Sequence, residues 1–179
     1  MLPKLHLLTA KDDGLRPALA CVRITKKDLR ACSGFIGAII QTESTGLKIE
    51  QLPESPVYMK AESFKLLTTP DVVAIIFEGE FFRVLLRNKP YKLAPIYELD
   101  ENYPDLDAVF PTGDQAKDTG EVGINPTLLS LLAEGLTLPS EKNKSLKLKF
   151  CGTNRAILVK TFASELDAKG IILPVAIEN

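Results

Sequence analysis

Two segments of the chain repeat the same order of apolar and polar positions, and each predicts one helix followed by three strands. In the first segment, residues 57–99, a short extended stretch precedes a helix over residues 61–67. Phe64 and Leu67 share one face of that helix, and Pro70 prevents its continuation. The predicted strands cover residues 72–77, 81–86 and 91–99, separated by a tight turn at 78–80 and a break at 88–90.

The second segment begins with an extended stretch at residues 122–124, followed by Asn125 and Pro126. An Asn cap with Pro at the first helical position predicts a helix start, and the leucine-rich helix over residues 127–134 should stop at Gly135. Three strands are expected, at residues 146–151, 156–162 and 171–177, with the first turn at 152–154. Residues 140–145 are polar and predict a solvated loop.

The N-terminal part predicts strands without a confident helix. Residues 18–24 and 28–42 have β character, and residues 5–8 are expected to be extended. The chain would then hold two full strand–helix–three-strand units preceded by a partial one. The predicted fold class is α+β, with helices segregated on one side of antiparallel sheets.

A proline-bracketed segment, residues 103–111, connects the two full units. Each proline fixes its own φ and pushes the preceding residue, Tyr103 or Phe110, into an extended conformation. We therefore expect a stiff strap between packed units. The predicted organisation is a first domain at residues 1–102, a strap and loop at 103–120, and a half domain at 121–179.

Composition predicts a soluble globular protein. The chain has 179 residues, of which 45% are hydrophobic and 25% charged, with a net charge of −1. No apolar run approaches the roughly 20 residues of a membrane span, and no secretory signal is evident, so a cytoplasmic location is expected. The near-neutral charge argues against a protein whose whole surface binds nucleic acid, although a local basic face remains compatible.

The sequence contains no convincing set of catalytic residues. The sole histidine, His6, lies near the N-terminus, and no phosphate-binding glycine loop is present. The three cysteines, Cys21, Cys32 and Cys151, form no C-x-x-C pair and are expected to be buried thiols. We expect a protein that is not an enzyme and that has no cofactor and no metal site.

Four segments, in order, resemble the bacterial sliding clamp, the beta subunit of DNA polymerase III. Residues 17–22 and 29–35 resemble strands of the middle domain, and residues 57–67 resemble the opener and helix of that domain's second unit. The strap resembles the family's Phe/Tyr-Pro-Asp-Tyr-x-x-Val-x-Pro connector. Residues 123–126 and 171–177 resemble the last unit and its Met-Pro-Met-Arg-Leu terminus. The resemblance implies a DNA-clamp fold of repeated β-α-β-β-β units, without counterparts of the first clamp domain or the first unit of the last domain.

The departures from the family pattern run from polar to apolar. In the family signature Ala-Thr-Asp-Gly-His-Arg-Leu, this chain has Ser33 for Asp, Phe35 for His and Ile36 for Arg. At the tail, Ala176 replaces Arg. A peptide-binding surface built from these residues would make fewer polar contacts than in the family, and it would prefer a different peptide motif.

The resemblance also implies a groove that binds short peptides of polymerases and repair proteins. Its expected residues come from the signature, the helix after the opener and the tail: Cys32, Gly34, Phe35, Ile36, Phe64, Leu173, Pro174 and Val175. The alternative, that the apolar Phe35-Ile36 pair is simply core, stays open.

Contact with duplex DNA is the weaker implication. Lys60 and Lys65 flank the first predicted helix, whereas the second predicted helix has no basic residue. The lysines at 142, 144, 147 and 149 also fit a solvated loop and strand face. A homo-oligomer is expected; a family ring of twelve units would need four such chains, and a dimer or a form that is not a ring is equally compatible.

Three functions therefore stay open. The first is a clamp-like replication accessory protein that docks partner peptides, with or without circling DNA. The second is a non-catalytic regulatory module that mimics or inhibits a host clamp. The third is an unrelated α+β ligand-binding domain.

Overall fold

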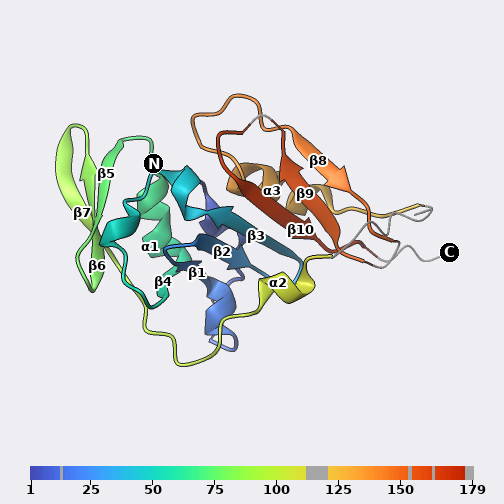
Figure 1. Ribbon diagram of the computed structural model, residues 1–179, viewed down its shortest axis with the longest axis horizontal. Coiled ribbons are helices and arrows are strands. Elements are labelled where there is room, and N and C mark those ends of the chain that lie inside the picture. Colours follow the sequence, from blue (N-terminus) through green and yellow to red (C-terminus); the bar gives the residue numbers. More distant parts are fainter. Residues whose placement is uncertain (13, 112–120, 153–154, 163, 176–179) are drawn as a thin grey trace.

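The computed structural model describes residues 1–12, 14–111, 121–152, 155–162 and 164–175, and these form two antiparallel sheets (Figure 1). The larger sheet has seven strands in the order β4-β1-β2-β3-β10-β9-β8. Its bounds are β1 Cys21–Ile24, β2 Asp28–Cys32, β3 Ile36–Gln41, β4 Val57–Lys60, β8 Leu146–Lys149, β9 Ile157–Thr161 and β10 Ala168–Ile172. The smaller sheet consists of β5 Val72–Phe77, β6 Phe81–Leu86 and β7 Lys89–Pro95.

The predicted repeat is confirmed in its order of elements. Helix α1 (Ala61–Lys65), extended by the 3-10 turn η5 (Leu66–Thr68), precedes the meander β5-β6-β7, and helix α3 (Pro126–Gly135) precedes β8-β9-β10. In both units, a residue that follows the last strand pairs with the extended segment ahead of the helix. The N–H of Tyr97 donates to the carbonyl of Tyr58 at 2.8 Å, and the N–H of Val175 donates to the carbonyl of Gly123 at 2.9 Å. Each acceptor lies just ahead of its unit's helix.

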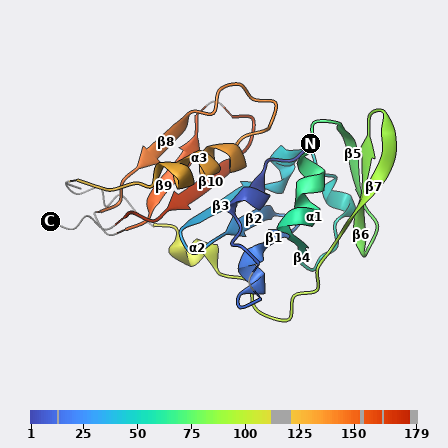
Figure 2. The same cartoon turned by 180° about the vertical axis from the view of Figure 1, so that it is seen from behind.

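The N-terminal residues differ from the expected extended stretch. Leu5–Leu8 form a 3-10 turn, η1, whose Leu5 and Leu8 are fully buried. This turn packs between α1 and α3 on one face of the large sheet (Figure 2). The partial first unit therefore does place a short helical turn beside the two helices. The prediction was wrong because the turn is stabilised by burying leucines from one side, which a four-residue window cannot reveal.

Several strand bounds also needed correction. Pro17–Ala20 form a 3-10 turn, η2, ahead of β1, and the predicted strand at residues 28–42 is two strands separated by a turn at Ser33. β7 begins at Lys89 and includes Pro90, which is tolerated because β7 is an edge strand. Residues 171–177 continue as a strand only to Ile172; residues 176–177 and the 153–154 part of the predicted turn lie outside the described residues. The remaining 3-10 turns are η3 Thr42–Thr45 and η4 Ile49–Gln51.

Alternation along the strands divides the core between the two faces of the large sheet. In β3, Ile36, Ala38 and Ile40 belong to the main core, which lies on the face covered by η1, α1 and α3. Ile39 points to the opposite, outer face and packs in a second cluster with Leu106 of the strap. The strap therefore has its own apolar anchorage on the sheet.

The strap itself is less extended than predicted. Helix α2 (Leu106–Val109) forms one turn within it, and Asp105 caps that turn by accepting a hydrogen bond from the N–H of Asp107 at 3.1 Å. Phe110 is extended, as expected for a residue before proline. Residues 112–120 of the predicted strap and loop lie outside the described residues, and the predicted domain division stays a prediction. The two sides of the strap share one sheet because β3 pairs with β10.

Candidate functional site

The turn between β2 and β3 presents an exposed aromatic side chain. Phe35 is 65% exposed although the strands beside it are buried. The Ser33 hydroxyl oxygen accepts hydrogen bonds from the N–H groups of Phe35 and Ile36, at 3.3 and 3.4 Å. The N–H of Leu173 donates to the Phe35 carbonyl at 2.9 Å, so the tail after β10 is fixed alongside the turn. The site therefore joins segments far apart in the sequence.

A small apolar cavity of about 160 Å³ lies beside the turn, under the strap. It is bounded by the β2–β3 turn, by the strap and by the end of β10. Its lining residues are Leu19, Cys32, Ser33, Gly34, Phe35, Ile36, Pro104, Leu106, Val109, Ile171 and Leu173. Because these side chains are mostly apolar, the cavity suits an aliphatic or aromatic side chain.

A second cavity, of about 520 Å³, shares the turn and extends toward the helices. The turn residues 33–36 and Leu19 line both cavities, so Phe35 stands between them. The other lining residues are Leu7, Thr9, Ala10, Lys11, Arg16, Leu128 and Leu131. Lys11 and Arg16 are exposed and give this cavity a basic side.

Most of the predicted groove residues are brought together. Cys32, Gly34, Phe35 and Ile36 line the smaller cavity with Leu173, and the exposed Val175 and half-buried Pro174 follow directly along the tail. Burial raises the pKa of the Cys32 thiol to about 11, and the Tyr103 hydroxyl acts weakly against this rise.

Phe64 does not belong to this site. Its side chain has no exposed surface and packs in the main core. The prediction for this residue was wrong because the apolar face of this short helix packs on the sheet. Phe64 is on that face and therefore has no exposed surface that could contact a peptide.

The sequence interpretation missed the strap and helix side chains of the site. Leu106 and Val109 line the smaller cavity, and Leu128 and Leu131 line the larger one. Leu106 and Val109 are apolar positions of the strap, and the strap lies next to the turn on the outer face because β3 and β10 pair. That long-range pairing is what the sequence did not reveal.

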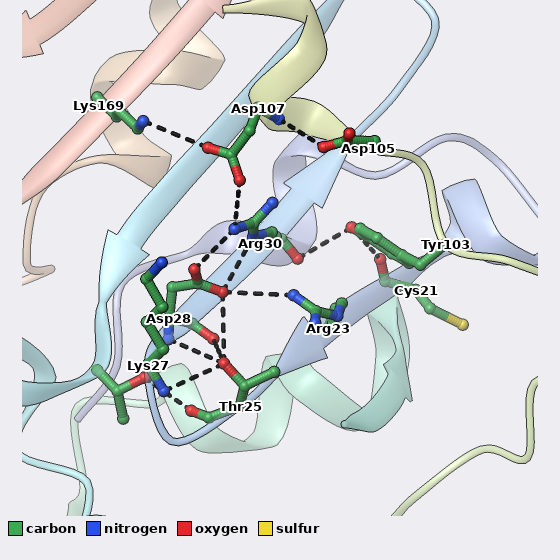
Figure 3. A network of polar contacts seen from close by, with 11 residues as sticks. Cys21, Arg23, Thr25, Lys27, Asp28, Arg30, Tyr103, Asp105, Asp107 and Lys169 are labelled. Carbon is green, nitrogen blue, oxygen red and sulfur yellow. Dashed lines mark hydrogen bonds and ion pairs between the residues drawn. The ribbon is translucent and has the colours of Figure 1, made fainter. Parts of the chain in front are cut away.

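A polar network fixes the strap on the sheet beside the smaller cavity (Figure 3). Asp28 is buried and accepts two hydrogen bonds from Arg30, which also forms an ion pair with Asp107 at 2.7 Å. The hydrogen bond from Arg30 is the main reason that the pKa of Asp107 lies below its usual value. The Tyr103 hydroxyl donates to the Arg30 carbonyl at 3.0 Å. The strap is therefore held by hydrogen bonds as well as by apolar contacts.

The two lysines expected at DNA differ in their surroundings. Lys60 forms an ion pair with Asp12 at 2.9 Å, and its ammonium lies 4.6 Å from the centre of the Tyr97 ring. Lys65 is exposed at the end of α1. Asp13, which follows Asp12 in the sequence, lies outside the described residues.

No protein-family model matches the sequence, and no curated protein matches it either. Solved structures do match. A DNA polymerase sliding clamp from Pseudomonas aeruginosa, solved with a ligand, superposes with a TM-score of 0.60 at 14% identity, over 98% of this chain and 65% of that chain. The chain has the fold of the bacterial sliding clamps.

Two further matches agree with this sliding-clamp fold. The beta subunit of DNA polymerase from Streptococcus pyogenes gives a TM-score of 0.60 at 16% identity, covering 97% of this chain and 63% of that one. The beta subunit of DNA polymerase III from Thermotoga maritima gives 0.53 at 12% identity, covering 98% and 63%. The chain therefore spans a little under two thirds of the length of these clamps.

The described residues hold neither a cluster of metal-ligating side chains nor a helix that could span a membrane. Among them, no group of three or more histidine, cysteine, aspartate or glutamate side chains is placed to hold a metal ion. None of the helices in this part of the chain has the length and apolar character needed to cross a membrane.

Proposed function

We propose that this protein is a non-catalytic, sliding-clamp-like accessory protein that docks replication or repair proteins by binding short peptides. The observation that carries the proposal is the exposed Phe35 standing between two cavities, beside the tail residue Leu173. An exposed aromatic side chain between apolar hollows offers anchoring surface for two or three side chains of a peptide.

The chemistry of the site suggests which peptides it selects. The walls of the smaller cavity are mostly apolar, and the basic residues Lys11 and Arg16 lie only at the larger one. A peptide with aliphatic or aromatic anchors would gain most of its affinity from burying them. An acidic residue beside those anchors would lie near Lys11 and Arg16 and would add charge complementarity.

Assembly and DNA contact are part of the same proposal. The clamp fold supports a homo-oligomer, with duplex DNA held loosely and without sequence preference on the helix-bearing face. Lys65 is an exposed cation of that face and is the better candidate for a phosphate contact. Lys60 is the weaker candidate because it already forms an ion pair with Asp12. No feature of the described residues favours the regulatory or inhibitory alternative.

A peptide-binding assay tests the docking proposal. Fluorescence polarisation with a clamp-binding peptide should show weaker binding for Phe35→Ala and for Pro174→Ala, by about tenfold for Phe35→Ala because truncation of a central anchor costs about 1–2 kcal/mol. Phe162→Ala is the matched control, since Phe162 is 64% exposed, similar to Phe35, but lies beyond the other end of β9. Binding that survives both groove substitutions would reject the groove.

A further inference from the structure

The strand register aligns basic side chains in one row across the outer face of the large sheet. Arg23 pairs with Arg30, Lys169 with Lys160, and Lys160 with Lys147. Ile39 lies between Arg30 and Lys169 in the same row. Directly paired residues of antiparallel strands share a face, and neighbouring strands are about 4.8 Å apart. Tyr58 of β4 pairs with Arg23 and completes the row, so five of its seven positions are cationic.

Carboxylates neutralise only one end of the row. Asp28 forms ion pairs with Arg23 and Arg30, and Asp107 contacts Arg30 and, at 3.6 Å, Lys169 (Figure 3). At the other end, Lys160 and Lys147 are exposed, and no carboxylate of the described residues pairs with either. Like charges directly opposite each other in a sheet destabilise it, so an anionic partner would relieve a repulsion that the fold itself leaves in place.

An exposed aromatic side chain stands beside these lysines. Phe162 follows Lys160 by two positions, and its N–H donates to the Ser145 carbonyl at 2.9 Å, which continues the β8–β9 ladder by one step. Strand alternation therefore places Phe162 on the same face as Lys160. Lys149 shares that face with Lys147 by the same alternation, while the exposed Glu165 and Asp167 are acidic residues in the segment before β10. The outer lysine patch is defined as Lys147, Lys160 and Phe162.

We propose that the outer lysine patch binds the backbone of single-stranded nucleic acid. Lysines on the patch would contact phosphates, and the exposed ring of Phe162 would stack on a base. This combination of cations and an exposed aromatic ring is typical of surfaces that hold single strands without sequence preference. A duplex keeps its bases stacked inside and would leave the ring without a partner, and an acidic peptide would have no base to stack on it. The patch lies on the face opposite α1 and α3, so the proposal does not depend on the peptide groove or on the helix-bearing face.

Binding of a labelled single-stranded oligothymidine, measured by fluorescence polarisation at about 50 to 200 mM salt, tests the proposal. Lys147→Gln with Lys160→Gln should weaken binding and should reduce the slope of log affinity against log salt by about 1.4, at about 0.7 per phosphate contact. The control, Lys48→Gln with Lys92→Gln, removes the same charge from exposed positions elsewhere and should leave the slope unchanged. Phe162→Ala should weaken binding about tenfold because it removes base stacking.

Three outcomes would overturn the proposal. The first is a salt slope that is equal for the patch variant and the control variant. The second is loss of binding in Lys65→Gln but not in the patch variant, which would place the nucleic acid on the helix-bearing face. The third is full competition by an acidic polypeptide, together with duplex binding that is insensitive to Phe162→Ala. Thermal melting of each variant would show that these exposed substitutions leave the fold intact.

Discussion

The guanidinium of Arg30 donates two hydrogen bonds to the carboxylate of Asp28, at 3.0 and 2.9 Å. Asp28 is only 2% exposed, and the Thr25 hydroxyl and Arg23 also contact it. Through Arg30 this buried carboxylate is connected to Asp107 on the strap. The geometry of the strap, and with it one wall of the smaller cavity, therefore depends on a pair within β2.

Asp28→Ala should destabilise the protein by about 2–4 kcal/mol, because it leaves Arg30 without its buried partner. Asp107→Ala is the control: this partner of Arg30 is half exposed, so its loss should cost less than about 1 kcal/mol. Urea unfolding of both variants measures the difference. Equal losses would show that burial of Asp28 does not set the strength of the network.

Tyr103→Phe should cost about 1 kcal/mol in the free energy of unfolding. The substitution removes the hydroxyl that donates to the Arg30 carbonyl at 3.0 Å but keeps the ring, which lies 5.9 Å from the ring of Tyr58. Tyr103→Ala should cost clearly more, since it removes the apolar contacts of the ring as well. Urea unfolding curves of the two variants check the order. If Tyr103→Phe were as unstable as Tyr103→Ala, the stabilisation by Tyr103 would come entirely from its hydroxyl group and not from its ring.

Local signals in the sequence predicted the repeated order of elements and failed at contacts between distant segments. The start of α3 was predictable because Asn125 accepts a hydrogen bond from the Thr127 N–H at 2.9 Å, with Pro126 at the first helical position. The α2 turn was missed, although Asp105 is a favoured N-cap residue, because two prolines suggested an extended strap. Local propensity therefore sufficed wherever one cap or one turn decided the structure.

The candidate site shows where local sequence signals do not suffice. Phe35 was predicted for the groove by resemblance alone, with a core position left open, because an apolar residue between two strands fits either role. Its exposure follows from the turn that Ser33 stabilises. The contact of this turn with Leu173 requires the pairing of β3 with β10, which are separated by most of the chain. No short-range pattern encodes that pairing.

Gly170→Ala should destabilise the protein by about 1–3 kcal/mol through overpacking. A Cβ at this position of β10 would lie 3.0 Å from side-chain atoms of Leu132 and Leu136 and 3.3 Å from the Gly37 carbonyl oxygen. Gly34→Ala is the control, since nothing lies within 4 Å of its added Cβ, and it should change stability by less than about 0.5 kcal/mol. Thermal unfolding of the two variants separates them; equal melting temperatures would show that helix α3 does not pack closely on β10.

The thiols of Cys21 and Cys32 should react slowly with a disulfide reagent in the native protein. Both are buried, and burial raises each pKa to about 11, so little thiolate is present near pH 8. Unfolding in urea should expose all three cysteines and make them react rapidly. The colour released by an aromatic disulfide reagent measures both rates. Immediate reaction of two or more thiols in the folded protein would contradict the burial of Cys21 and Cys32.

The stability of the protein should fall as the pH drops from about 6.5 to about 4, and His6 should account for part of this fall. Burial, assisted by the charges of Lys65 and Lys4, lowers the pKa of His6 from 6.5 to about 4. Between these values the unfolded chain binds a proton that the folded protein does not, so the free energy of unfolding decreases as the pH decreases. Because the ring is only partly buried, we expect a contribution of about 1–2 kcal/mol.

His6→Gln isolates this contribution, since the lowered carboxylate pKa values of Asp107 and Glu134 affect both proteins equally. Urea unfolding at several pH values should give a shallower pH dependence for the variant between about 6.5 and 4. Parallel curves for the two proteins would mean that His6 accepts its proton as readily in the folded protein as in the unfolded chain. In that case η1 would not hold the imidazole against α1, because a ring in contact with water keeps its ordinary pKa.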